Sequence, residues 1–183
     1  MVLQIYLYGS NVLREETKHV TPDYPELKQL IDNMYETMYS AEGVGLAAPQ
    51  IGRALRLFVV DASPMAEEYP ETEGFKKTFI NPTIIETYGE SFSYEEGCLS
   101  IPNIREDVVR DSVVKIKYFD EDFNEHTDVY EGIISRIVQH EYDHVEQVMF
   151  TDRVSQLKKK LLKRKLDNIK NGKNMPAYKA RIN

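Results

Sequence analysis

A stripe of apolar side chains that ends in two histidines constrains this chain more than any other feature. The stripe lies on a helix predicted from about residue 131 to residue 148. Ile133, Ile137, His140 and His144 stand at positions i, i+4, i+7 and i+11, so they share one face of that helix. An apolar stripe that runs into two histidines is typical of a pocket wall leading to a metal.

The histidines belong to the stretch QHEYDH, residues 139–144, which contains His140-Glu141-x-x-His144. Two imidazoles one helical turn apart can chelate a single divalent metal, and the glutamate between them can act as a general base. The same spacing also arises by chance in long helices. In that case both histidines would be core or surface residues whose nitrogens are satisfied by ordinary hydrogen bonds.

A catalytic metal of this type usually takes three protein ligands and a water molecule. Ten residues after His140 the chain has Phe150, so the third histidine of the metzincins is absent. The other two histidines, His19 and His126, lie far upstream. Glu146 follows the second histidine of the motif by only two residues, so it faces away from that histidine on a helix.

Elimination leaves Cys98, the only cysteine, as the third ligand. A thiolate is a strong soft ligand, and a Cys/His/His set leaves one coordination position open. The alternative is a small, buried, apolar cysteine, which is common for free cysteines. A lone cysteine also excludes an internal disulfide and agrees with a reducing compartment.

The remaining pattern predicts one domain of the α+β class that spans residues 1–183. We expect mostly antiparallel β-sheets around the central helix that carries the HExxH motif. An N-terminal helix is predicted within 21–45 and a basic C-terminal helix at about 155–170. Between them, 43–52 is predicted as a small-residue loop and 55–63 as a strand, with later turns at Gly89 and at 120–124.

The first sixteen residues lack the basic start, apolar run and cleavage site of a secretory signal. No stretch approaches the roughly 18 apolar residues that a membrane helix needs. We therefore expect a cytoplasmic protein, with neither a membrane nor DNA as a partner.

Charge is distributed unevenly over the chain. Residues 151–183 contain 11 Lys and Arg but only 2 Asp and Glu, whereas the net charge of the whole chain is −7. Five apolar residues of this tail would form one face of a helix: Leu157, Leu161, Leu162, Leu166 and Ile169. The lysines on the other face indicate either a docked terminal helix with a solvated side or a contact with ribosomal RNA.

Three blocks together resemble the signature motifs of the peptide deformylases. GVGLAAPQ (43–50), EGCLS (96–100) and QHEYDH (139–144) stand in the order and rough spacing of that family. The resemblance covers nearly the whole chain. It implies a metal-dependent hydrolase that removes the formyl group from the N-terminal formyl-methionine of new polypeptides and releases formate. One departure is Gln147, which stands where the family usually has a glycine.

The resemblance also assigns roles to individual residues. Cys98, His140 and His144 would bind the metal, and Glu141 would be the general acid and base. The oxyanion would be stabilised by Gln50 and the backbone N–H of Leu99. The residues implied at the substrate cleft are Val44, Gly45, Gly97 and, near its entrance, Arg105. Ile133 and Ile137 are candidates for the pocket of the methionine side chain, with an ordinary core as the alternative.

The metal implied by the resemblance is one Fe²⁺ ion, although Cys/His/His would also accept Zn²⁺, Ni²⁺ or Co²⁺. The expected partners are N-formyl-methionyl nascent peptides. Two other functions remain open at this point. A zinc endopeptidase of the HExxH type would need a third ligand downstream, and an inactive deformylase-like binding module would be expected to have lost a ligand or the general base.

Overall fold

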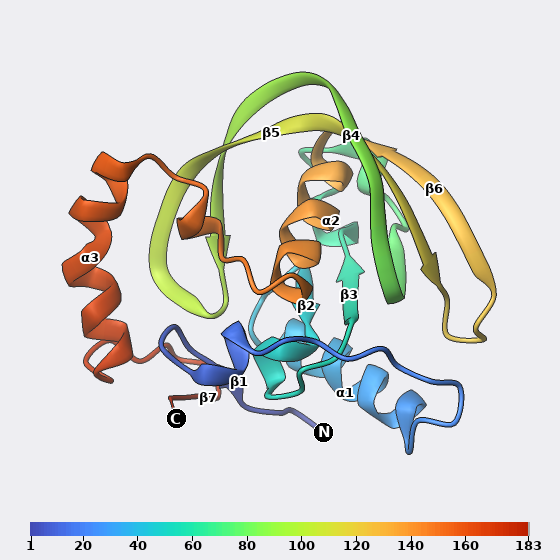
Figure 1. Ribbon diagram of the computed structural model, residues 1–183, viewed down its shortest axis with the longest axis horizontal. Helices are drawn as coiled ribbons and strands as arrows, with labels where there is room; N and C mark the ends of the chain where they lie inside the picture. Colours follow the sequence, from blue (N-terminus) through green and yellow to red (C-terminus); the bar gives the residue numbers. More distant parts are fainter. Residues whose placement is uncertain (183) are drawn as a thin grey trace.

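The computed structural model describes residues 1–182 of the chain, which form an α+β fold built on an antiparallel sheet (Figure 1). Within these residues the main sheet has five strands in the order β2-β3-β4-β5-β6. Its strands are β2 (Gly45–Ala47), β3 (Leu57–Asp61), β4 (Lys76–Cys98), β5 (Ile101–Phe119) and β6 (Glu125–Glu131). A separate parallel pair joins β1 (Ile5–Tyr6) to β7 (Ala180–Arg181). The predicted fold class is confirmed.

Three α-helices surround or adjoin the sheet in the described part of the chain: α1 (Leu27–Ser40), α2 (Gly132–Val145) and α3 (Gln156–Lys170). Short 3-10 helices connect the elements: η1 (Asn11–Arg14), η2 (Ala48–Ile51), η3 (Ser63–Met65), η4 (Pro70–Thr72) and η5 (Phe150–Asp152). Ser155 begins α3 by accepting a hydrogen bond from the backbone N–H of Lys158 at 3.3 Å, as expected of an N-cap serine.

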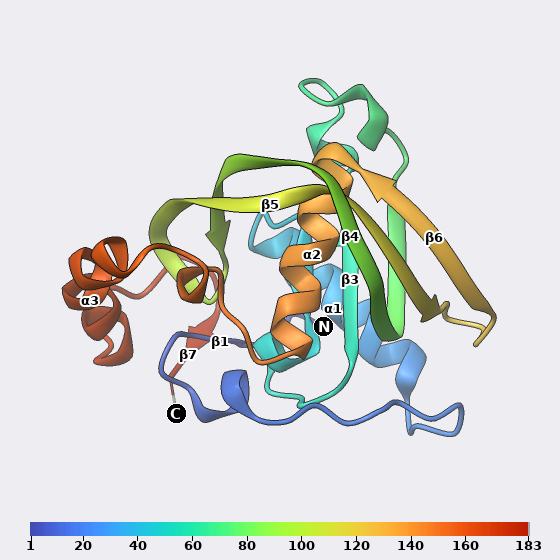
Figure 2. The ribbon, with the colours of Figure 1, turned by 45° about the horizontal axis from the view of Figure 1, so that its top comes forward.

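The helix α2 lies at the centre of the molecule, where the long hairpin of β4 and β5 curves around it (Figures 1 and 2). The β4–β5 pairing has irregularities in register at several points, and such bulges bend and twist a strand. Gly89 lies at one of them with a φ of 85°. The predicted turn at Gly89 is therefore wrong, because this glycine lies inside β4. The predicted turn at 120–124 is confirmed, since β6 begins at Glu125.

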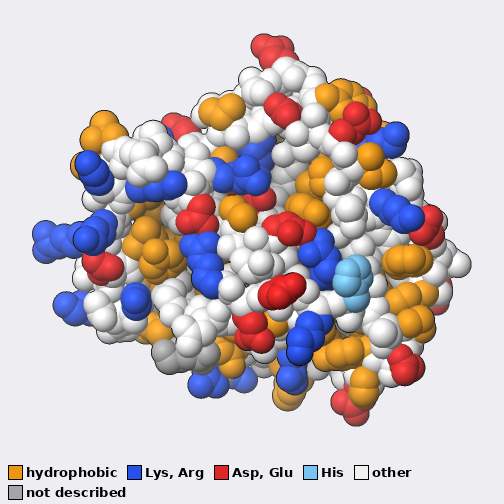
Figure 3. All heavy atoms as spheres, in the orientation of Figure 1, with side chains coloured by type: hydrophobic (Ala, Val, Ile, Leu, Met, Phe, Trp, Pro, Cys, Tyr) orange, Lys and Arg blue, Asp and Glu red, His pale blue; other side chains and the backbone are white. Residues whose placement is uncertain are grey.

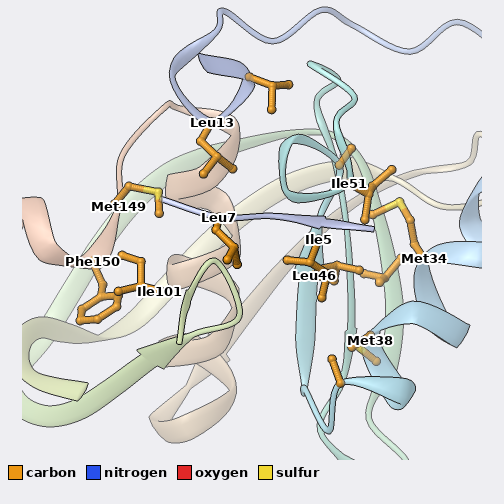
Figure 4. Packing of buried hydrophobic residues seen from close by; sticks show 14 of the residues in the cluster. Ile5, Leu7, Leu13, Met34, Met38, Leu46, Ile51, Ile101, Met149 and Phe150 are labelled. Atoms are coloured by element: carbon orange, nitrogen blue, oxygen red, sulfur yellow. The ribbon is translucent and has the colours of Figure 1, made fainter. Parts of the chain in front are cut away.

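Strand β3 is buried on both faces, which explains its continuous apolar sequence. Phe58 and Val60 pack with the apolar face of α2, whereas Leu57 and Val59 belong to the cluster that includes α1 and β1. Figure 4 shows this second cluster, with Leu7 and Ile5 of the N-terminal segment among residues from several elements. The sheet is thus covered on its two sides by α2 and α1.

The predicted loop at 43–52 is partly wrong. Residues Gly45–Ala47 form β2, which pairs antiparallel with β3 and lies at one edge of the main sheet. Ala48–Ile51 form the 3-10 helix η2. An edge strand has unpaired backbone groups on its outer side, so β2 can receive an extended peptide as a further strand.

Helix α2 ends three residues earlier than predicted, and the backbone turns left-handed at Gln147. The N–H of Val148 donates to the carbonyl of Asp143 at 2.8 Å, and the N–H of Gln147 donates to that of His144 at 3.3 Å. These two bonds define a Schellman ending, in which the residue after the cap takes a left-handed conformation. Gln147 has a φ of 58°. A glycine would adopt this conformation without steric strain.

We expect Gln147→Gly to stabilise the protein by about 0.5–1 kcal/mol. The relief of left-handed strain, about 1–2 kcal/mol, exceeds the greater chain entropy that glycine loses on folding, about 0.5–1 kcal/mol. Urea unfolding measures the difference. Gln29→Gly in the ordinary helical backbone of α1 is the control, and it should destabilise by about 1 kcal/mol. Equal losses in the two variants would contradict the assignment.

Candidate metal centre

Three potential metal ligands come together between the end of β4 and the last turns of α2. The Sγ of Cys98 and the ring nitrogens of His140 and His144 all lie within 4.8 Å of one another. Cys98 Sγ is 3.3 Å from His144 Nε2. The tight turn between β4 and β5 follows directly at Leu99 and fixes the cysteine beside the helix. The tertiary structure therefore brings the cysteine next to the two histidines of the motif.

The donor set fits a divalent transition metal. His140 Nδ1 is 2.9 Å from Glu96 Oε2, so the other ring nitrogen, Nε2, is left for coordination. A carboxylate on the second nitrogen is the usual partner of a metal-binding histidine, because it fixes the ring orientation and raises ligand basicity. The Nδ1 of His144 is buried without a hydrogen-bond partner among residues 1–182.

Glu96 is the centre of a buried ionic network. Arg110 donates to both of its carboxylate oxygens, at 2.7 and 3.0 Å, and Arg136 donates to Oε1 at 2.9 Å. Burial by itself would raise the pKa of Glu96, but the hydrogen bonds from Arg110 and His140 hold that pKa well below its usual value. Glu96 therefore stays ionised and can orient His140 as a carboxylate.

The network continues along α2 to Asp143, which directly precedes the second histidine of the motif. Arg110 Nη1 donates to Asp143 Oδ2 at 2.8 Å, and Arg153 holds both oxygens of the same carboxylate at 2.5 Å. Arg136 also donates to the backbone carbonyl of Val108 at 2.8 Å. These bonds tie β4, β5, α2 and the segment after α2 into one unit behind the ligands.

Glu141 lies against the backbone of β2. Its side chain is buried, and Oε2 has no hydrogen-bond partner among the described residues. Burial raises the pKa of Glu141 to about 7. A Cβ atom at Gly45 would come within 2.4 Å of Glu141 Oε1, so only glycine leaves room for the carboxylate at this position. This contact explains why position 45 is a glycine, which the sequence alone could not show.

The side-chain amide of Gln50 is oriented by three contacts. Its Oε1 accepts the backbone N–H of Ala47 at 2.8 Å. Its Nε2 consequently points the other way, 3.4 Å from Cys98 Sγ and 3.2 Å from Ser100 Oγ. The amide N–H₂ thus faces Cys98, one of the three candidate ligands.

A cavity of about 820 Å³ opens onto these groups. All of the predicted site residues line it except His144, which lies buried behind the others: Val44, Gly45, Gln50, Gly97, Cys98, Leu99, Arg105, Ile133, Ile137, His140 and Glu141. Ile133 and Ile137 line this cavity and are also part of the core that α2 forms with the sheet. Arg105 lies at the surface and donates to Glu95 Oε2 at 2.9 Å.

Sequence reasoning missed two groups of residues around this cavity. The first is the ionic network, although Glu96 directly precedes Gly97 in the EGCLS block and Arg136 lies one helical turn before His140. The available signal was only a charged residue, Arg136, one helical turn before a candidate ligand. The second is the segment 175–178, which lines the cavity from the far end of the chain. Nothing in its sequence indicated this position.

Comparisons with known proteins agree with this geometry. The sequence model of the polypeptide deformylase family matches residues 2–160. A peptide deformylase of Flavobacterium johnsoniae is 52% identical, with 100% of this chain and 96% of the relative covered. The chain belongs to the peptide deformylase family.

Solved deformylase structures share the fold. The peptide deformylase of Legionella pneumophila superimposes with a TM-score of 0.82 at 36% identity and covers 96% of this chain and 100% of its own. That of Plasmodium falciparum gives a TM-score of 0.82 at 36% identity, with 92% and 96% covered. No helix among residues 1–182 combines the length and the apolar character needed to cross a membrane.

We expect Glu96→Gln to weaken metal binding by about 10–100-fold, the usual effect of removing the partner of a metal-binding histidine. It should also destabilise the fold by about 3–5 kcal/mol, because Arg110 and Arg136 lose the charge that compensates them in a buried site. Chelator competition and urea unfolding measure the two effects. The neighbouring Glu95→Gln is the matched control, since its pair with Arg105 is exposed and contributes about 0–1 kcal/mol. Metal affinity that is unchanged in Glu96→Gln would contradict the orienting role.

Proposed function

We propose that Cys98, His140 and His144 hold one divalent metal, at which the chain carries out the deformylase reaction. The chain is a hydrolase that removes the formyl group from the N terminus of new polypeptides. The observation that supports these roles is the meeting of the three ligand atoms within 4.8 Å at a cavity that Glu141 and Gln50 also line. A bound metal of this kind supplies a water of lowered pKa and an electrophile for the carbonyl oxygen.

Glu141 is the proton carrier in this proposal. Its carboxylate takes a proton from the attacking water as that water adds to the formyl carbon, and it later gives the proton to the leaving amine. Formate and a free N terminus result. Gly45 allows the carboxylate to approach the backbone of β2 closely, where the formyl group of a bound peptide would lie.

Two donors stabilise the tetrahedral oxyanion. Gln50 offers Nε2, which Ala47 and Ser100 hold in the required direction. Leu99 offers its backbone N–H directly beside Cys98. Because both donors are held before the reaction starts, they require little reorganisation, and the loss of one such donor typically costs about 2.7–4 kcal/mol of barrier.

The substrate enters as an extended strand at the edge formed by β2. Val44 and Gly45 offer backbone groups to it, and Gly97 keeps the path to Cys98 open. Ile133 and Ile137 contact the methionine side chain through the apolar stripe of α2. Arg105 lies at the entrance. The N-formyl-methionyl peptide is thus the substrate of one site built by a single domain.

The resident metal in this proposal is Fe²⁺, carried over from the resemblance to the family. The Cys/His/His donors accept Zn²⁺, Ni²⁺ and Co²⁺ as well, and Zn²⁺ binds such sites more tightly than Fe²⁺. An HExxH endopeptidase is disfavoured by the family to which the chain belongs. An inactive binding module is disfavoured because the three ligands and the general base are all present and close together.

The basic helix α3 is proposed to contact the ribosome, and the protein to work in the cytoplasm where nascent chains emerge. Leu162, Leu166 and Ile169 dock the helix, whereas Leu157 and Leu161 are 69% and 70% exposed, so the single apolar face predicted from the sequence is wrong. Lys and Arg side chains gather over this part of the surface (Figure 3). Counterion release from phosphates would stabilise a contact there.

We expect Glu141→Gln to lower kcat for a formyl-Met tripeptide by about 10²–10⁴-fold while the metal content is unchanged, since general acid–base catalysis contributes that much. Formate release from anaerobic, Fe²⁺-loaded enzyme measures the rate. The control is Glu146→Gln at the end of the same helix, whose partner is Arg56, and it should stay near the wild-type rate. An inactive wild-type enzyme with verified metal would refute the proposed activity.

We expect the double variant Lys160→Glu/Arg164→Glu to lose salt-sensitive co-sedimentation with ribosomes while formate release from small peptides is unchanged. Both side chains are exposed on α3. The matched control is Lys18→Glu/Lys28→Glu, which reverses two charges that are exposed elsewhere on the molecule. Co-sedimentation that both variants retain would reject the proposed contact.

A further inference from the structure

The segment that follows α3 returns to the substrate cavity. Met175, Pro176, Ala177 and Tyr178 all line this cavity, more than thirty residues after the HExxH motif. The match to the family's sequence model ends at residue 160, so the segment lies beyond the matched part of the chain. The groups assigned to the reaction above all precede it.

Hydrogen bonds fix this segment beside the turn that follows Cys98. The hydroxyl of Tyr178 donates to the backbone carbonyl of Leu99 at 2.5 Å. Two residues later β7 pairs with β1. The chain just after β1 is joined to the same turn, because the N–H of Tyr8 donates to the carbonyl of Ser100 at 2.8 Å. Figure 1 shows β1 and β7 side by side near the C terminus. The segment is therefore attached to the turn that contains Leu99 and forms one wall of the cavity.

The chemistry of this wall is apolar. Pro176 and Ala177 have no polar side-chain atoms, and Met175 is 48% exposed. A methionine is flexible and polarisable, so it adapts to side chains of different shape. The candidates for the formyl-methionine pocket, Ile133 and Ile137, lie on α2 instead. If the first side chain of a bound peptide points toward α2, the second and third residues of the peptide can contact the wall beside Leu99.

We propose that residues 175–178 contact the second and third residues of the substrate and favour apolar side chains there, with Met175 as the main determinant. This inference rests on the proposed function. Tyr178 acts as a positioning residue, because its bond to Leu99 holds the wall against the catalytic turn.

The test compares formyl-Met-Leu, formyl-Met-Gly and formyl-Met-Glu tripeptides with the same third residue. In Met175→Ala we expect kcat/KM for the Leu peptide to fall by about three- to tenfold, mainly through KM, and the Gly peptide to be unaffected. The effect is smaller than in a closed pocket because Met175 is half exposed. In Met175→Lys the preference for Glu over Leu should rise. Leu157→Ala is the control, since Leu157 is also apolar and exposed but lies outside the cavity lining.

The two proposals fail in different ways. An active wild-type enzyme whose Met175 variants change all three peptides equally, or change none, would overturn the specificity role and leave the proposed function intact. A metal-loaded wild-type enzyme that releases formate from none of the three peptides would overturn the proposed function and this inference with it.

Discussion

The buried carboxylate of Glu96 is the interaction on which the rest of the site depends. It joins β4 and β5 through Arg110, and it joins both strands to α2 through Arg136 and His140. An isolated charge in such a place would be strongly unfavourable, so the network is stable only when every partner is present. The packing of β4, β5 and α2 and the orientation of His140 therefore depend on the same set of hydrogen bonds to Glu96.

Close backbone approach is the second constraint. Gly45 is in contact with Glu141, so β2 and α2 meet at a distance that no side chain on the strand would permit. β2 is at the same time an edge strand. The proposed general base, Glu141 of α2, thus packs against the proposed peptide-binding edge. Gln50, the proposed oxyanion donor, follows β2 directly in η2. Positioning on strands and helices rather than long loops keeps these groups in place.

The C-terminal segment is held at the site partly through its pairing with the N-terminal strand β1. β7 pairs with β1, Tyr8 just after β1 is bonded to the turn after Cys98, and Tyr178 is bonded to Leu99, so residues 175–178 are held beside Leu99. Helix α3 lies between α2 and this segment in the sequence. It docks through three apolar residues and leaves two leucines and its basic side exposed. One short stretch of chain thereby completes the cavity, while another presents a charged surface to solvent.

The sequence by itself determined the α+β class, the three helices, the strand at 55–63 and the candidate ligands. Helical spacing placed His140 and His144 on one face, and elimination left Cys98 as the candidate third ligand. Tertiary structure decided what local patterns cannot encode. The charge network of Glu96, the contact between Gly45 and Glu141 and the return of residues 175–178 join positions far apart in sequence. Long-range contacts of this kind leave no periodicity in the sequence. The small residues of 43–52 and Gly89 predict a loop and a turn, whereas pairing with distant strands places Gly45–Ala47 and Gly89 in the sheet.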